Sequence, residues 1–143
     1  MAFRFTPSLA EWLTSPQGAE WLRRAETLPL TPATRLTDLQ TLRRHLSAEE
    51  AAAVVEQVLL RRRGGAKFER AGEMLFTRNA LEQATHAQVA RHRAARFAGL
   101  SPVADLGCGI GGDALALAGV AGRLLAVERN PVRLRFARHN LSV

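Results

Sequence analysis

Several residues and segments that mark whole classes of protein are scarce in this chain of 143 residues. Its one cysteine, Cys108, excludes a disulfide framework and is typical of a reducing compartment, so we expect a cytoplasmic protein. Apolar runs of membrane-spanning length are absent, and the first residues lack the apolar core of a signal peptide. We therefore expect a globular protein with no membrane partner. Histidine and cysteine at metal-ligand spacing are also absent, so no metal site is predicted.

Lysine is nearly absent too: of the 20 basic residues, 19 are arginine and Lys67 is the single lysine. The net charge is +7. Residues 1–66 carry nine basic and seven acidic side chains, whereas residues 67–143 carry eleven and six, a net +5. Such an excess favours contact with a polyanion, but the solvated surface of an arginine-rich protein has the same composition. Charge alone leaves both interpretations open.

The most informative stretch starts with the apolar run 102–106 and continues into the glycine-rich segment 107–112. The run predicts a buried strand, and the periodicity of residues 114–118 predicts a helix. Strand, glycine turn and helix form the layout of a nucleotide or nucleoside site at the edge of a doubly wound sheet. Glycines let a ligand approach the backbone closely, and the N–H groups at the helix start can receive a carboxylate or phosphate.

Two cofactor patterns fit this turn. The dinucleotide pattern G-x-G-x-x-G is formed by Gly107, Gly109 and Gly112. The pattern acid-x-G-x-G-x-G is formed by Asp105, Gly107, Gly109 and Gly111, and it resembles motif I of class I S-adenosylmethionine-dependent methyltransferases. A carboxylate at the strand end suits a ligand with a cationic amino group and would repel a pyrophosphate. The sequence therefore favours S-adenosylmethionine as the cofactor.

A second apolar run, residues 124–128, also predicts a strand that ends in an acid. Glu128 lies 23 residues after Asp105, at a spacing where a carboxylate can accept hydrogen bonds from both ribose hydroxyls. Asn130 and Pro131 then predict the start of another helix. A glycine turn followed by a second strand-end acid indicates an adenosine ligand.

Residues 1–66 predict a helical domain that ends at Gly64-Gly65. Hydroxyl residues followed by proline predict three helix starts, which are Thr6-Pro7, Ser15-Pro16 and Thr31-Pro32. The third of these helices is expected to bury a leucine stripe, which consists of Leu36, Leu39, Leu42 and Leu46. Ser47-Ala48-Glu49-Glu50 is a capping box that opens a fourth helix.

The segment between this domain and the first strand predicts two further helices. Thr77 is expected to cap a short helix over residues 78–84. A second capping box, Thr85-His86-Ala87-Gln88, is expected to open the next helix. The apolar residues assigned to that helix are Val89, Ala90, Ala94 and Phe97.

Residues 74–140 as a run resemble the N-terminal half of trimethylguanosine synthase-type RNA methyltransferases, especially bacterial relatives with a THUMP-like domain near their C-terminus. The segments that carry the resemblance are Phe76-Thr77, Thr85, Val89-Ala90, His92, residues 105–112, Glu128, Asn130-Pro131-Val132 and Ala137-Arg138-His139-Asn140. The resemblance implies that Asp105 and the amides of the glycine turn hold the methionine end of S-adenosylmethionine, while Glu128 holds the ribose. It also implies that Thr85 approaches the cofactor and that Phe68 packs near it.

The expected fold is α/β. A helical domain over residues 1–66 precedes residues 67–143, which form the cofactor-binding first half of a Rossmann-like class I methyltransferase fold with about two parallel strands. The family's substrate-side segment, an Asp/Asn/Ser-Pro-Pro-aromatic motif, is missing. We therefore expect a truncated fragment that is inactive alone, with its catalytic residues beyond residue 143. Two parallel strands also leave open sheet edges, through which the chain could associate with itself.

The function predicted for the parent protein is S-adenosylmethionine-dependent methylation of a base nitrogen in RNA. RNA is expected as the partner because of the resemblance and the +5 charge of residues 67–143. Two alternatives stay open. One is a fragment of an NAD(P)-dependent oxidoreductase, and the other is a non-catalytic RNA-binding or interaction module that works through the helical domain.

Overall fold

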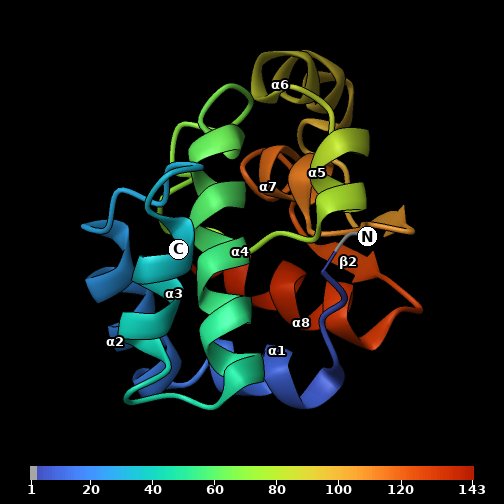
Figure 1. The fold of residues 1–143 in the computed structure, drawn as a ribbon. Coiled ribbons are helices and arrows are strands. Elements are labelled where there is room, and N and C mark those ends of the chain that lie inside the picture. The colour runs from blue at the N-terminus through green and yellow to red at the C-terminus, as the bar shows by residue number, and fades with distance from the viewer. Residues whose placement is uncertain (1–2) are drawn as a thin grey trace.

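The computed structural model describes residues 3–143 (Figure 1). Its elements in chain order are α1 (Pro7–Leu13), α2 (Pro16–Glu26), α3 (Arg35–Leu42), α4 (Ala48–Gly64), α5 (Arg78–Gln83), α6 (Ala87–Ala94), the 3-10 helix η1 (Ala95–Phe97), β1 (Val103–Leu106), α7 (Gly112–Ala118), β2 (Leu124–Val127) and α8 (Pro131–Asn140). None of the helices in the described part of the chain is long and apolar enough to cross a membrane. The predicted combination of helices with two parallel strands is confirmed.

Side-chain caps start most of the N-terminal helices where the sequence predicts them. The Thr6 hydroxyl accepts a hydrogen bond from the Leu9 amide, and the Ser15 hydroxyl accepts one from Gly18. Ser47 and Glu50 form the full capping box, in which each side chain accepts a hydrogen bond from the other residue's amide. These caps satisfy donors that the first turn of a helix leaves without intrahelical partners.

The predicted helix start at Thr31-Pro32 is wrong, because α3 begins four residues later, at Arg35. The Thr31 and Thr34 hydroxyls each accept a hydrogen bond from the other residue's amide, and they contact each other at 3.0 Å. These local bonds hold residues 31–34 in a turn and use the hydroxyl that would have capped a helix. The leucine stripe is also incomplete, since Leu36 is 67% exposed.

The long helix α4 passes through the middle of the molecule, with α2 and α3 to its left, α1 at its lower end and α8 passing behind it (Figure 1). One continuous apolar core joins the two halves and includes Leu13, Val54, Phe76 and Phe136. The Gln57 side chain, fully buried on α4, donates to the Phe76 carbonyl at 2.6 Å and accepts from the Phe76 amide at 3.0 Å. The division at residue 66 stays a prediction, and the two predicted domains share this core.

The helices between α4 and the sheet differ in one respect from the prediction. Thr77 caps α5 as expected, through the Ala80 amide. The N-cap of α6, however, is His86, whose Nδ1 accepts from the Gln88 amide at 3.2 Å, and not Thr85. Thr85 is free for this reason to bond elsewhere, as described below.

The apolar face predicted for the helix after Thr85 is only partly buried. Ala90 and Ala94 are buried, whereas Val89 is exposed and Phe97 lies exposed in η1. Small side chains thus make the close contact between α6 and the neighbouring α7, and the two larger ones face solvent.

The sheet is a parallel pair in which Val103 is opposite Leu124 and Leu106 is opposite Val127. One face carries Val103, Asp105, Leu124 and Ala126, and the last two pack with α7 and α8 around Ala114 and Ala137. The other face is apolar and bare: Leu106 is 77% exposed, Leu125 58% and Val127 42%. Parallel sheets are ordinarily covered on both faces, and here one face is left uncovered by residues 3–143.

Candidate functional site

The glycine turn between β1 and α7 adopts a backbone that requires glycine. Gly107, Gly109 and Gly111 have φ values of +80°, +60° and +88°, in the left-handed region that other residues rarely adopt. A Cβ atom placed on Gly107 or Gly109 would meet nothing within 4 Å. The turn therefore exposes backbone to open space, as a ligand that binds to main-chain groups requires.

Asp105, at the end of β1, has an oxygen with no partner. Its Oδ2 is inaccessible to solvent and has no hydrogen-bond partner among residues 3–143, although the residue as a whole is half-buried. Burial raises the pKa of Asp105, and the negative charge of Asp113 raises it further. A buried acceptor without a donor is costly, so this carboxyl is suited to a cationic or hydrogen-bond-donating group.

Glu128, at the end of β2, has the opposite environment. Its Oε2 accepts from the Gly109 amide at 3.1 Å and its Oε1 from the Asn130 amide at 2.8 Å. The Arg133 guanidinium lies 3.7 Å from Oε1, and the Glu128 side chain is only 5% exposed. Glu128 thus ties the glycine turn to the loop after β2. A carboxylate has about four acceptor positions, so each oxygen keeps room for a second donor such as a ribose hydroxyl.

Two adjacent cavities flank the turn. The first, about 210 Å³, is lined by the turn, by Thr85 and by Asp113. The Thr85 hydroxyl donates to Asp113 Oδ2 at 3.4 Å, which connects the segment before α6 to the start of α7. The second cavity, about 350 Å³, is lined by Gly107, Glu128 and Arg133. Gly107 and Arg133 line both cavities, so the structure brings Thr85, the glycines and Glu128 around one site.

Two predicted residues lie outside these cavities. The Asp105 side chain lines neither of them. Burial raises the pKa of the Cys108 thiol, and the negative charge of Asp105 raises it further. Phe68 is buried against Phe76, with ring centroids 5.8 Å apart. The Phe68 ring also lies 3.4 Å from where a Cβ on Gly112 would be. It therefore packs against the start of α7 without lining either cavity.

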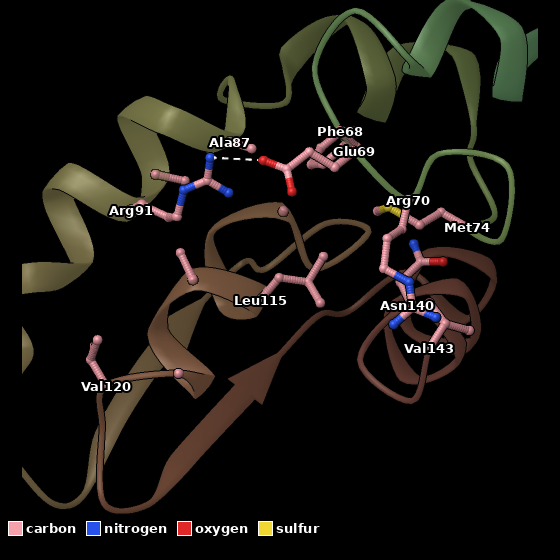
Figure 2. A pocket seen from close by; sticks show the side chains of 14 residues that line it. Phe68, Glu69, Arg70, Met74, Ala87, Arg91, Leu115, Val120, Asn140 and Val143 are labelled. Carbon is pink, nitrogen blue, oxygen red and sulfur yellow. Dashed lines mark hydrogen bonds and ion pairs between the residues drawn. The ribbon is translucent and has the colours of Figure 1, made fainter.

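Phe68 instead lines a cavity of about 410 Å³ between α6, α7 and the segment that precedes α5 (Figure 2). Met74, Leu115 and Val120 make much of its wall apolar, and Arg91 pairs with Glu69 across its rim at 3.0 Å. The buried oxygen without a partner lies elsewhere, on Asp105. Thr85, Asp113 and Glu128 line the two smaller cavities beside the glycine turn, and Asp105 lines none of the three.

Asn140 and Arg133, which were not predicted as site residues, complete the surroundings of the turn. Asn140, fully buried at the end of α8, donates to the Ile110 carbonyl in the turn and to the Leu75 carbonyl, both at 2.9 Å, and accepts from the Leu75 amide at 2.7 Å. Arg133 lies in the first turn of α8, where the helix dipole disfavours a cation. A cation predicted at the start of a helix indicates a neighbouring anion that compensates its charge, and here that anion is Glu128.

The N-terminal part of the chain matches a known family. Residues 7–64, from α1 to the end of α4, match the family described as Domain of unknown function (DUF8688). No solved structure matches the chain.

Two curated proteins from two strains of Mycobacterium tuberculosis are 46% identical to this chain over 103 residues. Both are named uncharacterized S-adenosylmethionine-dependent methyltransferases. The match covers 66% of this chain and 28% of each relative, so the chain spans little more than a quarter of the length of the relatives it matches. The cofactor in their names is the one predicted here from the glycine turn.

Proposed function

We propose that this chain forms the cofactor-binding part of a class I S-adenosylmethionine-dependent methyltransferase, with the first strands of a Rossmann-like sheet. The observation that carries the proposal is the unpartnered carboxylate of Asp105 beside an open turn of left-handed glycines. An acid at this point suits a ligand with a cationic amino group and disfavours the pyrophosphate of NAD(P). The names of the relatives support the same cofactor.

The residues around the turn fit the parts of S-adenosylmethionine. The amides of the turn and of the start of α7 would donate to its carboxylate, and Asp105 would accept from its ammonium group. Glu128 would accept from the ribose hydroxyls, while its bonds to Gly109 and Asn130 hold the carboxylate in place. Thr85, held by Asp113, would bind at the methionine end. When bound, the cofactor supplies an electrophilic methyl group on a sulfonium sulfur, for which alignment with the nucleophile is the main requirement.

The proposed substrate is a base nitrogen of RNA. Residues 67–143 carry the net charge of +5, and Arg93, Arg96, Arg123, Arg129 and Arg138 form no ion pair within residues 3–143. An excess of unpaired arginine favours a polyanionic partner. Association through the uncovered strands of the sheet is a further proposal, supported by the bare apolar face of Leu106, Leu125 and Val127.

Calorimetric titration with S-adenosylhomocysteine and, separately, with NAD⁺ tests the cofactor. We expect S-adenosylhomocysteine to bind and NAD⁺ not to bind. As a control, the charge-neutralising variant Glu69→Gln should bind S-adenosylhomocysteine as the unmodified chain does, because Glu69 lies at the rim of the 410 Å³ cavity and pairs with Arg91. Binding of NAD⁺ without binding of S-adenosylhomocysteine would replace this assignment with that of an oxidoreductase.

A further inference from the structure

A fourth cavity, about 400 Å³, lies between the N-terminal segment and the starts of α5 and α8. Three arginines line it, Arg4, Arg78 and Arg133, and its lining contains no acidic residue. In Figure 1 residues 3–6 pass in front of α8. This segment is anchored there by the edge-to-face contact of Phe5 with Phe136, whose ring centroids are 5.5 Å apart.

Two of the arginines are held in place by buried carboxylates. Arg78 is hydrogen-bonded to Glu56 at 2.9 Å, and Arg133 lies 3.7 Å from Glu128. The two glutamate side chains are only 11% and 5% exposed, whereas the arginine side chains are 37% and 31% exposed. The guanidinium groups therefore cover the negative charges and present their remaining N–H donors at the surface.

The third arginine has no such partner. Arg4 is exposed and forms no ion pair within residues 3–143. Asn79 and Gln83 contribute exposed amide groups to the same cavity, and neither side chain has a hydrogen-bond partner in the described part of the chain. The cavity thus combines a net positive charge with uncommitted hydrogen-bond donors, which is the chemistry that recognises phosphate.

This basic cavity adjoins the glycine-turn site. Gln83 and Arg133 line both it and the 210 Å³ cavity that contains Thr85 and the turn. S-adenosylmethionine has no phosphate group. Its single carboxylate is the only anionic group of that cofactor that the three arginines could bind. A phosphate in the basic cavity would therefore belong to a second molecule bound next to the methyl donor.

We propose that the cavity lined by Arg4, Arg78 and Arg133 binds a backbone phosphate of a single-stranded RNA substrate, adjacent to the nucleotide that is methylated. This inference rests on the proposed function and adds to it the place where the substrate is held. The buried pairs Arg78–Glu56 and Arg133–Glu128 give the phosphate a fixed position, and Arg4 supplies an additional cation from the N-terminal segment.

The test compares two arginines that differ in place and not in charge. Arg4→Gln removes the unpaired cation of the cavity, and Arg35→Gln removes an exposed, unpaired cation from α3. Binding of a short fluorescent single-stranded RNA is measured by anisotropy over a series of KCl concentrations. We expect Arg4→Gln to weaken binding about fivefold and to lower the slope of log Kd against log salt by about 0.7, the value for one phosphate contact on a single strand. Arg35→Gln should change affinity less than twofold.

A titration of the same samples with S-adenosylhomocysteine separates this inference from the proposed function. Unchanged cofactor binding together with a selective loss of RNA affinity in Arg4→Gln supports the phosphate site. RNA binding that the two variants weaken equally, or that neither weakens, overturns the site and leaves the cofactor assignment intact. Competition by polyglutamate as strong as that by RNA also overturns it, since the cavity would then take any polyanion. Absence of S-adenosylhomocysteine binding in the unmodified chain would instead refute the proposed function.

Discussion

The ends of the two strands carry the same kind of side chain in contrasting surroundings. Asp105 at the end of β1 has a buried oxygen without a partner, whereas Glu128 at the end of β2 accepts two amide hydrogen bonds and lies next to Arg133. A buried carboxylate that accepts hydrogen bonds from the protein stabilises the fold. A buried carboxylate oxygen without a donor lowers the free energy of unfolding unless a ligand supplies the donor. The two acids, alike in sequence, thus differ in whether the protein itself supplies the hydrogen-bond donors that a buried carboxylate needs.

The largest expected effect is on ligand binding when Asp105 is replaced. Asp105→Asn should weaken S-adenosylhomocysteine binding about 100-fold, because a charge-assisted hydrogen bond to the ligand's ammonium group is lost. The free energy of unfolding should stay the same or rise by about 1 kcal/mol, since no protein donor loses its acceptor. Calorimetry and chemical denaturation measure the two quantities. A fall in stability with unchanged affinity would reverse the roles assigned to the two acids.

Glu128→Gln is expected to show a mixed effect. One amide hydrogen bond and the attraction of Arg133 are weakened, so the free energy of unfolding should fall by about 1–2 kcal/mol. S-adenosylhomocysteine affinity should fall about tenfold, because the glycine turn loses part of its brace and the ribose loses a charged acceptor. The contrast with Asp105→Asn disappears if Glu128→Gln proves as stable as the unmodified protein.

A smaller effect is expected from Asn140, with Gln57 as its matched control. Both side chains are fully buried amides that bind neighbouring residues, Leu75 and Phe76, but only Asn140 reaches the Ile110 carbonyl in the turn. Asn140→Ala and Gln57→Ala should each lower stability by about 2 kcal/mol. At a temperature where both variants are folded, we expect S-adenosylhomocysteine affinity to fall about threefold more in Asn140→Ala. Equal affinities in the two variants would assign Asn140 a purely structural role.

The smallest effect concerns pH. Burial and the charge of Asp113 raise the pKa of Asp105 above its ordinary value of 3.8, so the folded state binds this proton more readily than the unfolded state. The contribution of Asp105 to stability therefore falls as the pH rises from about 3.8 through the raised folded value. The free energy of unfolding of the unmodified protein, measured relative to that of Asp105→Asn by denaturation, should therefore increase as the pH is lowered through this range. A difference that is independent of pH would contradict the raised pKa.

Local sequence patterns predicted the features that depend on neighbouring residues. The strand, glycine turn and helix around Asp105 follow from apolar runs and glycines, and the Ser47 capping box follows from two residues three positions apart. The predicted helix start at Thr31 was wrong because the Thr31 and Thr34 hydroxyls each accept a hydrogen bond from the other residue's amide, in a local turn.

Contacts between distant residues could not be read from such patterns. Thr85 and Asp113 are 28 residues apart, and Asn140 and Leu75 are 65 apart, so only the packing of α6, α7 and α8 brings each pair together. That Phe68 packs near the cofactor stays a prediction, whereas its burial against Phe76 is decided by the fold of the whole core. The basic cavity likewise combines the N-terminal segment with two helix starts far along the chain.

The hydrogen bonds of Gln57 and Asn140 to residues 75–76 have a practical consequence for anyone who clones this protein. They form a bridge from α4 through Phe76 and Leu75 to the carbonyl of Ile110. A plasmid that encodes residues 67–143 alone would deprive Phe76 of both its amide partner and its apolar cover. Any shortened version that is meant to keep the glycine turn should therefore also include α4.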